Sequence, residues 1–172
     1  MAETRDERDR RHWEAIEEAG ELLLEHRFEQ ALIELRRILS EDPNNPYAFN
    51  LLGNALWEIG ELEPARDAFR AAVLLAPNFL GARVGLSNCL RQLGALEEAE
   101  RQARVALERF PKDGDAMHAL GLALAARGKR GEARLQLEGF LDAHPEVEAQ
   151  SEVRQILEML GFGQEGEPLE FE

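Results

Sequence analysis

The side chains best suited to nucleophilic, general-base or metal-binding chemistry are four histidines and one cysteine, namely His12, His26, Cys89, His118 and His144. No two histidines lie three to five residues apart, the spacing that places two ligands on one metal ion. The sequence also lacks a glycine loop for phosphates and a nucleophile elbow. A single cysteine cannot form an internal disulfide. We therefore expect no enzyme activity, no metal and no cofactor, with Cys89 as a small core residue.

The charge of the chain narrows the choice of partners. Lys and Arg total 20 against 34 for Asp and Glu, which gives a net charge of −14. Such a surface repels phosphates and anionic lipids, so we expect no nucleic-acid binding and no membrane insertion. A neutral or basic protein partner is favoured, mainly through faster encounter. The first eleven residues contain no apolar leader, and only two basic residues are lysines, so we expect a cytoplasmic bacterial protein.

An internal repeat of 34 residues sets the elements that would position these side chains. Four columns of residues recur with this period, and each column keeps one residue type or size. They are the prolines Pro43, Pro77, Pro111 and Pro145; the alanines Ala31, Ala65, Ala99 and Ala133; the leucines Leu22, Leu56, Leu90 and Leu124; and the small residues Ala19, Gly53, Ser87 and Gly121. Four columns in phase indicate a stack of identical structural units.

Each period reads as helix, tight turn, helix and loop. Proline ends a helix because it lacks an amide hydrogen and clashes with the preceding turn. Gly60, Gly94 and Gly128 lie midway between the prolines, where a left-handed residue suits a sharp turn. The sequence therefore predicts an all-α fold, in which Gly53 lets two paired helices approach closely around Phe69.

The pattern resembles the tetratricopeptide repeat, in which W-x2-L-G-x2-Y, A-x3-F and P follow one another. The second period carries it as Phe49, Leu52, Gly53, Leu56, Ala65, Phe69 and Pro77, and the third and fourth periods carry related residues. The resemblance covers residues 12–147. It implies a right-handed α-solenoid of stacked helix-turn-helix repeats that binds protein and does not catalyse a reaction.

The same register predicts the bounds of each unit. The repeats are 12–45, 46–79, 80–113 and 114–147, after a charged extension over 1–11 and before a capping helix over 148–161 and an acidic flexible tail over 162–172. The extension is expected to be a frayed start of the first helix. The first repeat diverges most, with His26 where the turn glycine belongs. In the cap, Val153, Ile156 and Leu160 recur at helical spacing and would cover the apolar edge of the last repeat.

In this family the first helices of successive repeats line a concave groove that binds ligands. Carried onto this sequence, the groove positions are Trp13, Ile16, Leu23 and Leu24 in the first repeat; Tyr47, Asn50, Asn54, Trp57 and Glu58 in the second; Val84, Asn88, Arg91 and Gln92 in the third; and Asp115, His118, Leu122 and Ala125 in the fourth. Both tryptophans and the only tyrosine of the chain belong to this set.

Two readings stay open for the most informative groove residues. A tryptophan such as Trp57 could anchor a partner or pack against the neighbouring repeat. Asn50, Asn54 and Asn88 could bind a peptide backbone or support the packing of a helix pair. We expect a ligand with apolar or aromatic anchors and a neutral-to-basic flank. Relatives that bind chaperone tails carry a clamp of basic and amide residues where this chain has Gly81, Gly85, Asp115 and Ala119, so that ligand is not expected.

Three roles fit these observations. The first is an adaptor or scaffold that holds one partner within a bacterial multiprotein assembly. The second is a dedicated chaperone for secreted subunits, since the chain resembles the small acidic chaperones of type III secretion. The third is self-association as a homodimer, through exposed Ile16, Leu23 and Leu24 or through the tail. In that case Phe162, Leu169 and Phe171 would dock into a groove of the same chain or of a neighbour.

Overall fold

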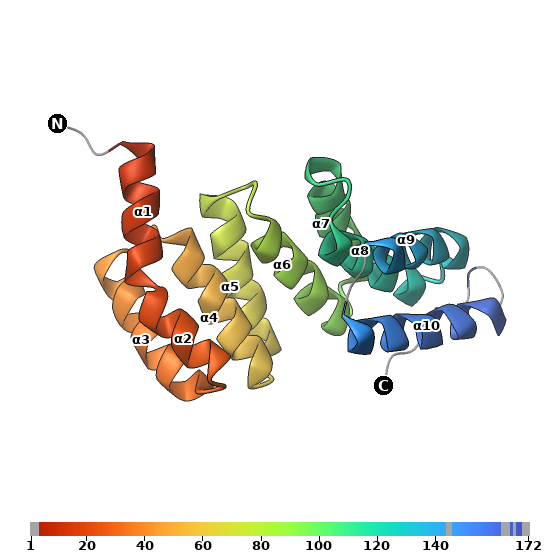
Figure 1. Cartoon of the computed structure of the whole chain (residues 1–172), viewed down its shortest axis with the longest axis horizontal. Helices are drawn as coiled ribbons and strands as arrows, with labels where there is room; N and C mark the ends of the chain where they lie inside the picture. The colour runs from red at the N-terminus through yellow and green to blue at the C-terminus, as the bar shows by residue number, and fades with distance from the viewer. Residues whose placement is uncertain (1–3, 144–145, 163–165, 167, 170–172) are drawn as a thin grey trace. The chain divides into compact units, whose positions relative to one another are not determined.

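The computed structural model describes residues 4–143, 146–162, 166 and 168–169, which form ten α-helices and no strand. The helices are α1 (Arg5–Ala15), α2 (Glu17–Leu24), α3 (Phe28–Glu41), α4 (Pro46–Glu58), α5 (Leu62–Leu75), α6 (Leu80–Gln92), α7 (Leu96–Arg109), α8 (Gly114–Ala126), α9 (Arg130–Asp142) and α10 (Val147–Phe162). Figure 1 shows them coloured in chain order from red to blue. Among the described residues, no helix is both long and apolar enough to cross a lipid bilayer.

The chain forms two compact units that divide within α6: unit 1, Met1–Gly85, and unit 2, Leu86–Glu172. In unit 1, α2 packs against α3, α3 against α4 and α4 against α5, while α1 contacts α4. In unit 2, α7 packs against α8, α8 against α9 and α9 against α10. Each unit has its own buried core, which includes Leu35 and Phe69 in unit 1 and Leu90, Leu124 and Leu137 in unit 2.

The two helices of each repeat are joined by the same turn. In the second repeat, the N–H of Glu61 donates to the carbonyl of Leu56 and the N–H of Gly60 donates to that of Trp57, both at 2.9 Å. This pair of bonds ends a helix at a left-handed residue. Gly60, Gly94 and Gly128 have φ angles of 83°, 79° and 73°, as the turn prediction requires. In the first repeat, His26 takes the same place at φ 57°.

Glycines let the helices of unit 1 close on Phe69 of α5. A Cβ atom built on Gly53 of α4 would lie 2.7 Å from the Phe69 ring, and one built on Gly85 of α6 would lie 2.5 Å away. These distances are well inside carbon–carbon contact, so the ring packs directly against two glycine backbones. In unit 2, Gly121 makes the corresponding close approach to Leu137.

The first repeat has two features of its own. Helix α1 begins at Arg5, within the charged extension, and is capped by reciprocal bonds between Thr4 and Glu7. The first helix is also broken at Ile16 into α1 and α2. The Ile16 side chain turns into the core and is 4% exposed, so the expectation that it forms part of an exposed apolar face is wrong.

The last helix, α10, covers the end of unit 2. Val153, Ile156 and Leu160 are buried, as their spacing predicts. The guanidinium of Arg130, at the start of α9, donates to the carbonyls of Met159 at 3.1 Å and Leu160 at 3.4 Å. Because these carbonyls lie in the last turn of α10, the bonds satisfy acceptors that the helix itself leaves open. His144, Phe171 and the side chain of Phe162 lie outside the described residues.

Candidate partner-binding surface

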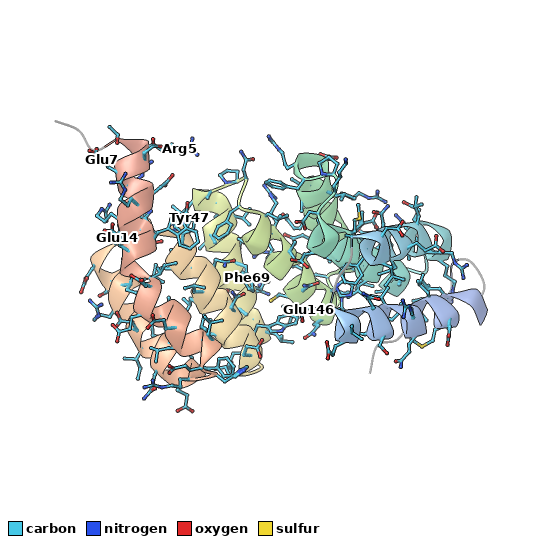
Figure 2. The ribbon with its side chains drawn as sticks, viewed as in Figure 1. Arg5, Glu7, Glu14, Tyr47, Phe69 and Glu146 are labelled. Carbon is cyan, nitrogen blue, oxygen red and sulfur yellow. The ribbon has the colours of Figure 1, made fainter. Side chains whose placement is uncertain are left out.

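Three aromatic side chains of unit 1 form a row, which we call the aromatic row. The ring centroids of Trp13 on α1 and Tyr47 on α4 lie 4.5 Å apart. The ring centroids of Tyr47 and Phe79 lie 5.3 Å apart, and Phe79 directly precedes α6. Figure 2 labels Tyr47, the middle member. Trp13 is 56% exposed, and the other two rings are half-buried. Aromatic surface left partly in water is typical of the anchor points of protein interfaces.

Asn45 holds two members of this row together. Its side chain is fully buried, and its carbonyl oxygen accepts the N–H groups of Tyr47 and Ala48, both at 3.0 Å. These bonds cap the start of α4. The side-chain amide of Asn45 donates in turn to the backbone carbonyl of His12 at 3.0 Å. Because Trp13 follows His12, one buried side chain sets Trp13 against Tyr47.

A hollow of about 790 Å³ opens beside the aromatic row, with Tyr47 and Phe79 in its lining. Its lining includes three arginines of α1, Arg5, Arg8 and Arg11, together with the carboxylates of Asp9 and Asp42. Arg11 donates to Asp42 at 2.5 Å. Burial would raise the pKa of Asp42, but its bonds with Arg11 and the N–H of Asn44 lower it, so this carboxylate is ionised. The hollow therefore offers guanidinium donors next to aromatic rings.

A second hollow of about 440 Å³ lies on α1 and α2 and is mostly apolar. Its lining consists of Trp13, Glu14, Ile16, Glu17, Gly20 and Leu51. Ile16 thus contributes to a wall of this hollow although little of its surface is exposed. The exposed edge of the Trp13 ring and this hollow together suit one apolar side chain of a partner.

The groove residues predicted on α4 differ in their access to solvent. Asn54 is exposed, and Trp57 and Asn50 are half-buried. The side-chain oxygen of Asn50 is buried and accepts no hydrogen bond from any described residue. A buried carbonyl oxygen without a donor is costly, so this oxygen weakens the packing of α4, and only the rest of the half-buried Asn50 side chain is open to a bound chain. Leu24 on α2 is 84% exposed, which agrees with the predicted apolar face at this position.

The groove residues predicted in unit 2 are less accessible. Asn88 and Arg91 on α6 are half-buried, as is Val84 in the adjoining part of that helix. Leu122 on α8 is only 6% exposed and Ala125 is fully buried. The two are covered by the chain itself, so the expectation that they face an open groove is wrong for this state of the molecule. Cys89 is buried, as expected for a small core residue.

His118 stacks on an aromatic ring of the neighbouring helix. Its ring stacks on Phe140 of α9, with centroids 4.8 Å apart and planes inclined by 27°. Burial lowers the pKa of His118, and the charges of Glu152 and Asp115 only partly oppose this effect. Its Nε2 atom is buried and has no hydrogen-bond partner among the described residues. The ring is therefore neutral near pH 7.

The sequence pattern did not identify Phe79 or the arginines of α1 as surface residues of interest. One signal could have pointed to Phe79. In the 34-residue register it occupies the place of Asn45 and Asp113, and both of those residues cap the helices that follow them. A phenylalanine cannot accept the N–H groups at a helix start, so its presence there suggests a different role.

Comparisons with known proteins agree with this architecture. The family model described as Tetratricopeptide repeat matches residues 18–78 and 50–114, which together span more than half of the chain. A search of curated proteins finds no match.

Solved structures share the fold at low sequence identity. A thermophilic TPR protein of Thermus thermophilus, TTC0263, is 24% identical, with a TM-score of 0.76 over 87% of this chain and 83% of that one. MamA from Desulfovibrio magneticus RS-1 is 18% identical, with a TM-score of 0.70 over 87% and 89% of the two chains. The first TPR of Spaghetti (RPAP3), bound to an HSP90 peptide, is 19% identical, with a TM-score of 0.62 over 67% and 91%. The predicted all-α solenoid fold is confirmed.

Proposed function

Because this chain belongs to the tetratricopeptide-repeat family, whose members are protein-interaction modules, we propose that it is an adaptor or scaffold without catalytic activity. It holds a protein or peptide partner within a bacterial multiprotein assembly. The observation that carries this proposal is the aromatic row of unit 1. Trp13, partly in water, lines the apolar hollow, and Tyr47 and Phe79 line the other one. A cytoplasmic location stays a prediction.

The partner presents apolar or aromatic anchors. The apolar hollow beside Trp13 suits one such side chain, and half-buried Trp57 offers a second contact on α4. Asn50 and exposed Asn54 lie one helical turn apart on α4, where their amides can pair with a peptide backbone. Once the costs of association are subtracted, the affinity for a short peptide is on the order of micromolar.

The flank of the partner is neutral to basic because the chain carries a net charge of −14. The hollow beside Tyr47 and Phe79 is lined by both arginines and carboxylates, so it suits a polar group at one end of the ligand. The chaperone-tail ligand of the Spaghetti neighbour is not proposed here, because Gly81 and Gly85 stand where the clamp side chains would be needed. A Cβ at Gly85 would also collide with Phe69.

The test is capture of partners from a bacterial lysate by the immobilised full chain. We compare the wild type with Trp13→Ala and with the double variant Trp57→Ala, Asn54→Ala. Loss of an anchor at a hot spot costs about 2 kcal/mol, so recovery of the specific partner should fall about 30-fold. Ile33→Ala is the matched control, since Ile33 is an exposed apolar residue on α3, away from these surfaces.

Equal recovery of every partner by all four proteins would show that neither the aromatic row nor α4 binds the partner. The identity of the recovered partner also separates the two roles that share this surface. A secreted subunit would favour the dedicated-chaperone role, and a resident component of an assembly would favour the adaptor.

A further inference from the structure

The four turns between paired helices are alike in backbone but differ in burial. Each has the same two bonds that end the first helix and a left-handed residue. That residue is exposed in the first three repeats, as His26, Gly60 and Gly94, but Gly128 is buried in the fourth. The last residue of the first helix behaves in the same way. Leu24, Glu58 and Gln92 are exposed, whereas Ala126 is 9% exposed.

In the fourth repeat, two residues near the end of the chain bond to this turn. The N–H of Gly166 donates to the carbonyl of Gly128 at 2.8 Å, and the N–H of Leu169 donates to the carbonyl of Ala125 at 3.0 Å. Both acceptors belong to the end of α8 and its turn. The Leu169 side chain is half-buried. Gly166 and Leu169 are therefore bonded through their backbone N–H groups to the end of α8 and its turn.

This place on α8 is part of the predicted groove. Leu122 and Ala125 follow Asn54 and Trp57 by 68 residues, which is two repeats. Leu122 is covered, whereas Asn54 is exposed. The carbonyls of Gly128 and Ala125 accept bonds from Gly166 and Leu169, whereas the matching residues of the second repeat, Gly60 and Trp57, are exposed and half-buried. The donors are backbone amides, so another extended peptide can make the same two bonds.

We infer that the end of α8, with its turn, is a binding site for an extended peptide segment. The chain's own stretch that carries Gly166 and Leu169 is its resident, displaceable occupant. The ligand donates two backbone N–H groups, three residues apart, to the carbonyls of Gly128 and Ala125. It carries a branched apolar side chain at the place of Leu169, which is half-buried here. This inference deepens the proposed function and rests on it in one respect. The peptide that would displace the chain's own residues from this site is a segment of the proposed partner.

Attachment to the chain favours the resident segment over a free copy of the same peptide. A short flexible connection gives an effective concentration in the millimolar range. Two backbone bonds and one half-buried leucine make a weak contact, so the same peptide added in solution should bind with a dissociation constant of about 100 micromolar. The attached segment then reduces the apparent affinity of a competing peptide about tenfold.

The experiment uses the full chain and a labelled synthetic peptide of residues 163–172, GQEGEPLEFE. In the variant Leu169→Glu, the half-buried leucine is replaced by a charged side chain, which weakens the binding of the attached segment to the end of α8. This variant should bind the peptide about tenfold more tightly than the wild type. Ala126→Glu should bind it at least tenfold more weakly than Leu169→Glu does. A glutamate at this register already occurs in the second repeat as Glu58, and Gln92→Glu in the third repeat is the matched control.

Amide hydrogen exchange in the wild-type chain gives an independent readout. The N–H groups of Gly166 and Leu169 should exchange about tenfold more slowly than in the free peptide, and Ala126→Glu should abolish that protection. Equal peptide binding by wild type and Leu169→Glu, or no binding to either at millimolar peptide, overturns the inference. So does exchange of the two amides at free-peptide rates. None of these readouts depends on the partner captured through Trp57, so the two proposals can fail separately.

Discussion

His26 is strained in a way that the other turn residues are not. Among the described residues it is the one non-glycine with a positive φ, at 57°. A side chain in this region costs about 1–2 kcal/mol, because its Cβ crowds the following carbonyl oxygen. The His26 ring contacts Phe28, with centroids 5.6 Å apart, which offsets part of that cost.

His26→Gly should therefore raise the free energy of unfolding by about 0.5–1 kcal/mol, after the greater flexibility of glycine in the unfolded chain is subtracted. Thermal denaturation followed by circular dichroism measures it as a rise of about 2 °C in Tm. Gly94→Ala is the converse control and should lower stability. A fall in Tm for His26→Gly would show that the contact with Phe28 outweighs the backbone strain.

Glu100 is the other residue whose energetics stand out. It is buried on α7 and accepts bonds from three cations: Arg104 at 2.8 Å, Arg127 at 2.5 Å and Lys129 at 3.0 Å. Burial would raise the pKa of Glu100, but the bonds from Lys129, Arg104 and Arg127 together lower it below its ordinary value of 4.5. As the pH falls, Glu100 therefore takes up a proton in the unfolded chain at a higher pH than in the folded chain.

The stabilisation from Glu100 is present above about pH 4.5 and is lost as the pH falls through its lower folded pKa. Glu100→Gln should lower the free energy of unfolding at pH 7 by about 1–2 kcal/mol, since the three cations remain partly in water. The variant should also lose less of its free energy of unfolding between pH 7 and pH 4 than the wild type does. Urea denaturation at pH 7 and pH 4 checks both statements, with exposed Glu97→Gln as the control. An equal acid slope in Glu100→Gln and the wild type would contradict this account.

At the scale of elements, the contact of α4, α5 and α6 depends on glycine backbones. The Phe69 ring leaves no space for a Cβ at Gly53 or Gly85. Gly20 on α2 is different, because a Cβ built there meets no atom within 4 Å. Replacing glycine by alanine should therefore lower the free energy of unfolding at Gly53 and Gly85 and raise it at Gly20.

Gly53→Ala should lower the free energy of unfolding by about 1–3 kcal/mol, because the added methyl forces the ring out of place. Gly20→Ala should raise it by about 0.5–1 kcal/mol, since alanine favours a helix over glycine. Adding Phe69→Leu to Gly53→Ala should recover part of the loss if the clash is the cause. Chemical denaturation of the four proteins gives the comparison. A loss in Gly20→Ala as large as in Gly53→Ala would rule out the close approach as the reason.

The sequence predicted elements better than it predicted contacts between them. Proline and glycine act within a few residues, so Pro43 and Gly60 marked helix ends and turns correctly. The break at Ile16 was missed because it depends on the burial of that side chain in the core. The pairing of Trp13 with Tyr47 was also missed, since it follows from the bond between Asn45 and His12, 33 residues apart.

At the scale of the whole chain, the repeats are alike in fold and unlike in surface. The first two repeats leave Trp13, Leu24 and Asn54 accessible, while the fourth is covered by α10 and the C-terminal segment. The tail has too little apolar content to predict its own docking, although docking into a groove was one of the open possibilities. Its two backbone bonds appear only once the end of α8 and the tail lie together.

The central claim is that the aromatic row of unit 1 binds the partner. The most direct measurement is calorimetric titration of the captured partner into the full chain, as wild type, Trp13→Ala and Ile33→Ala. The account predicts at least a tenfold loss of affinity for Trp13→Ala and a change of less than about twofold for Ile33→Ala. Equal affinities for Trp13→Ala and the wild type, or a larger loss for Ile33→Ala than for Trp13→Ala, would contradict it.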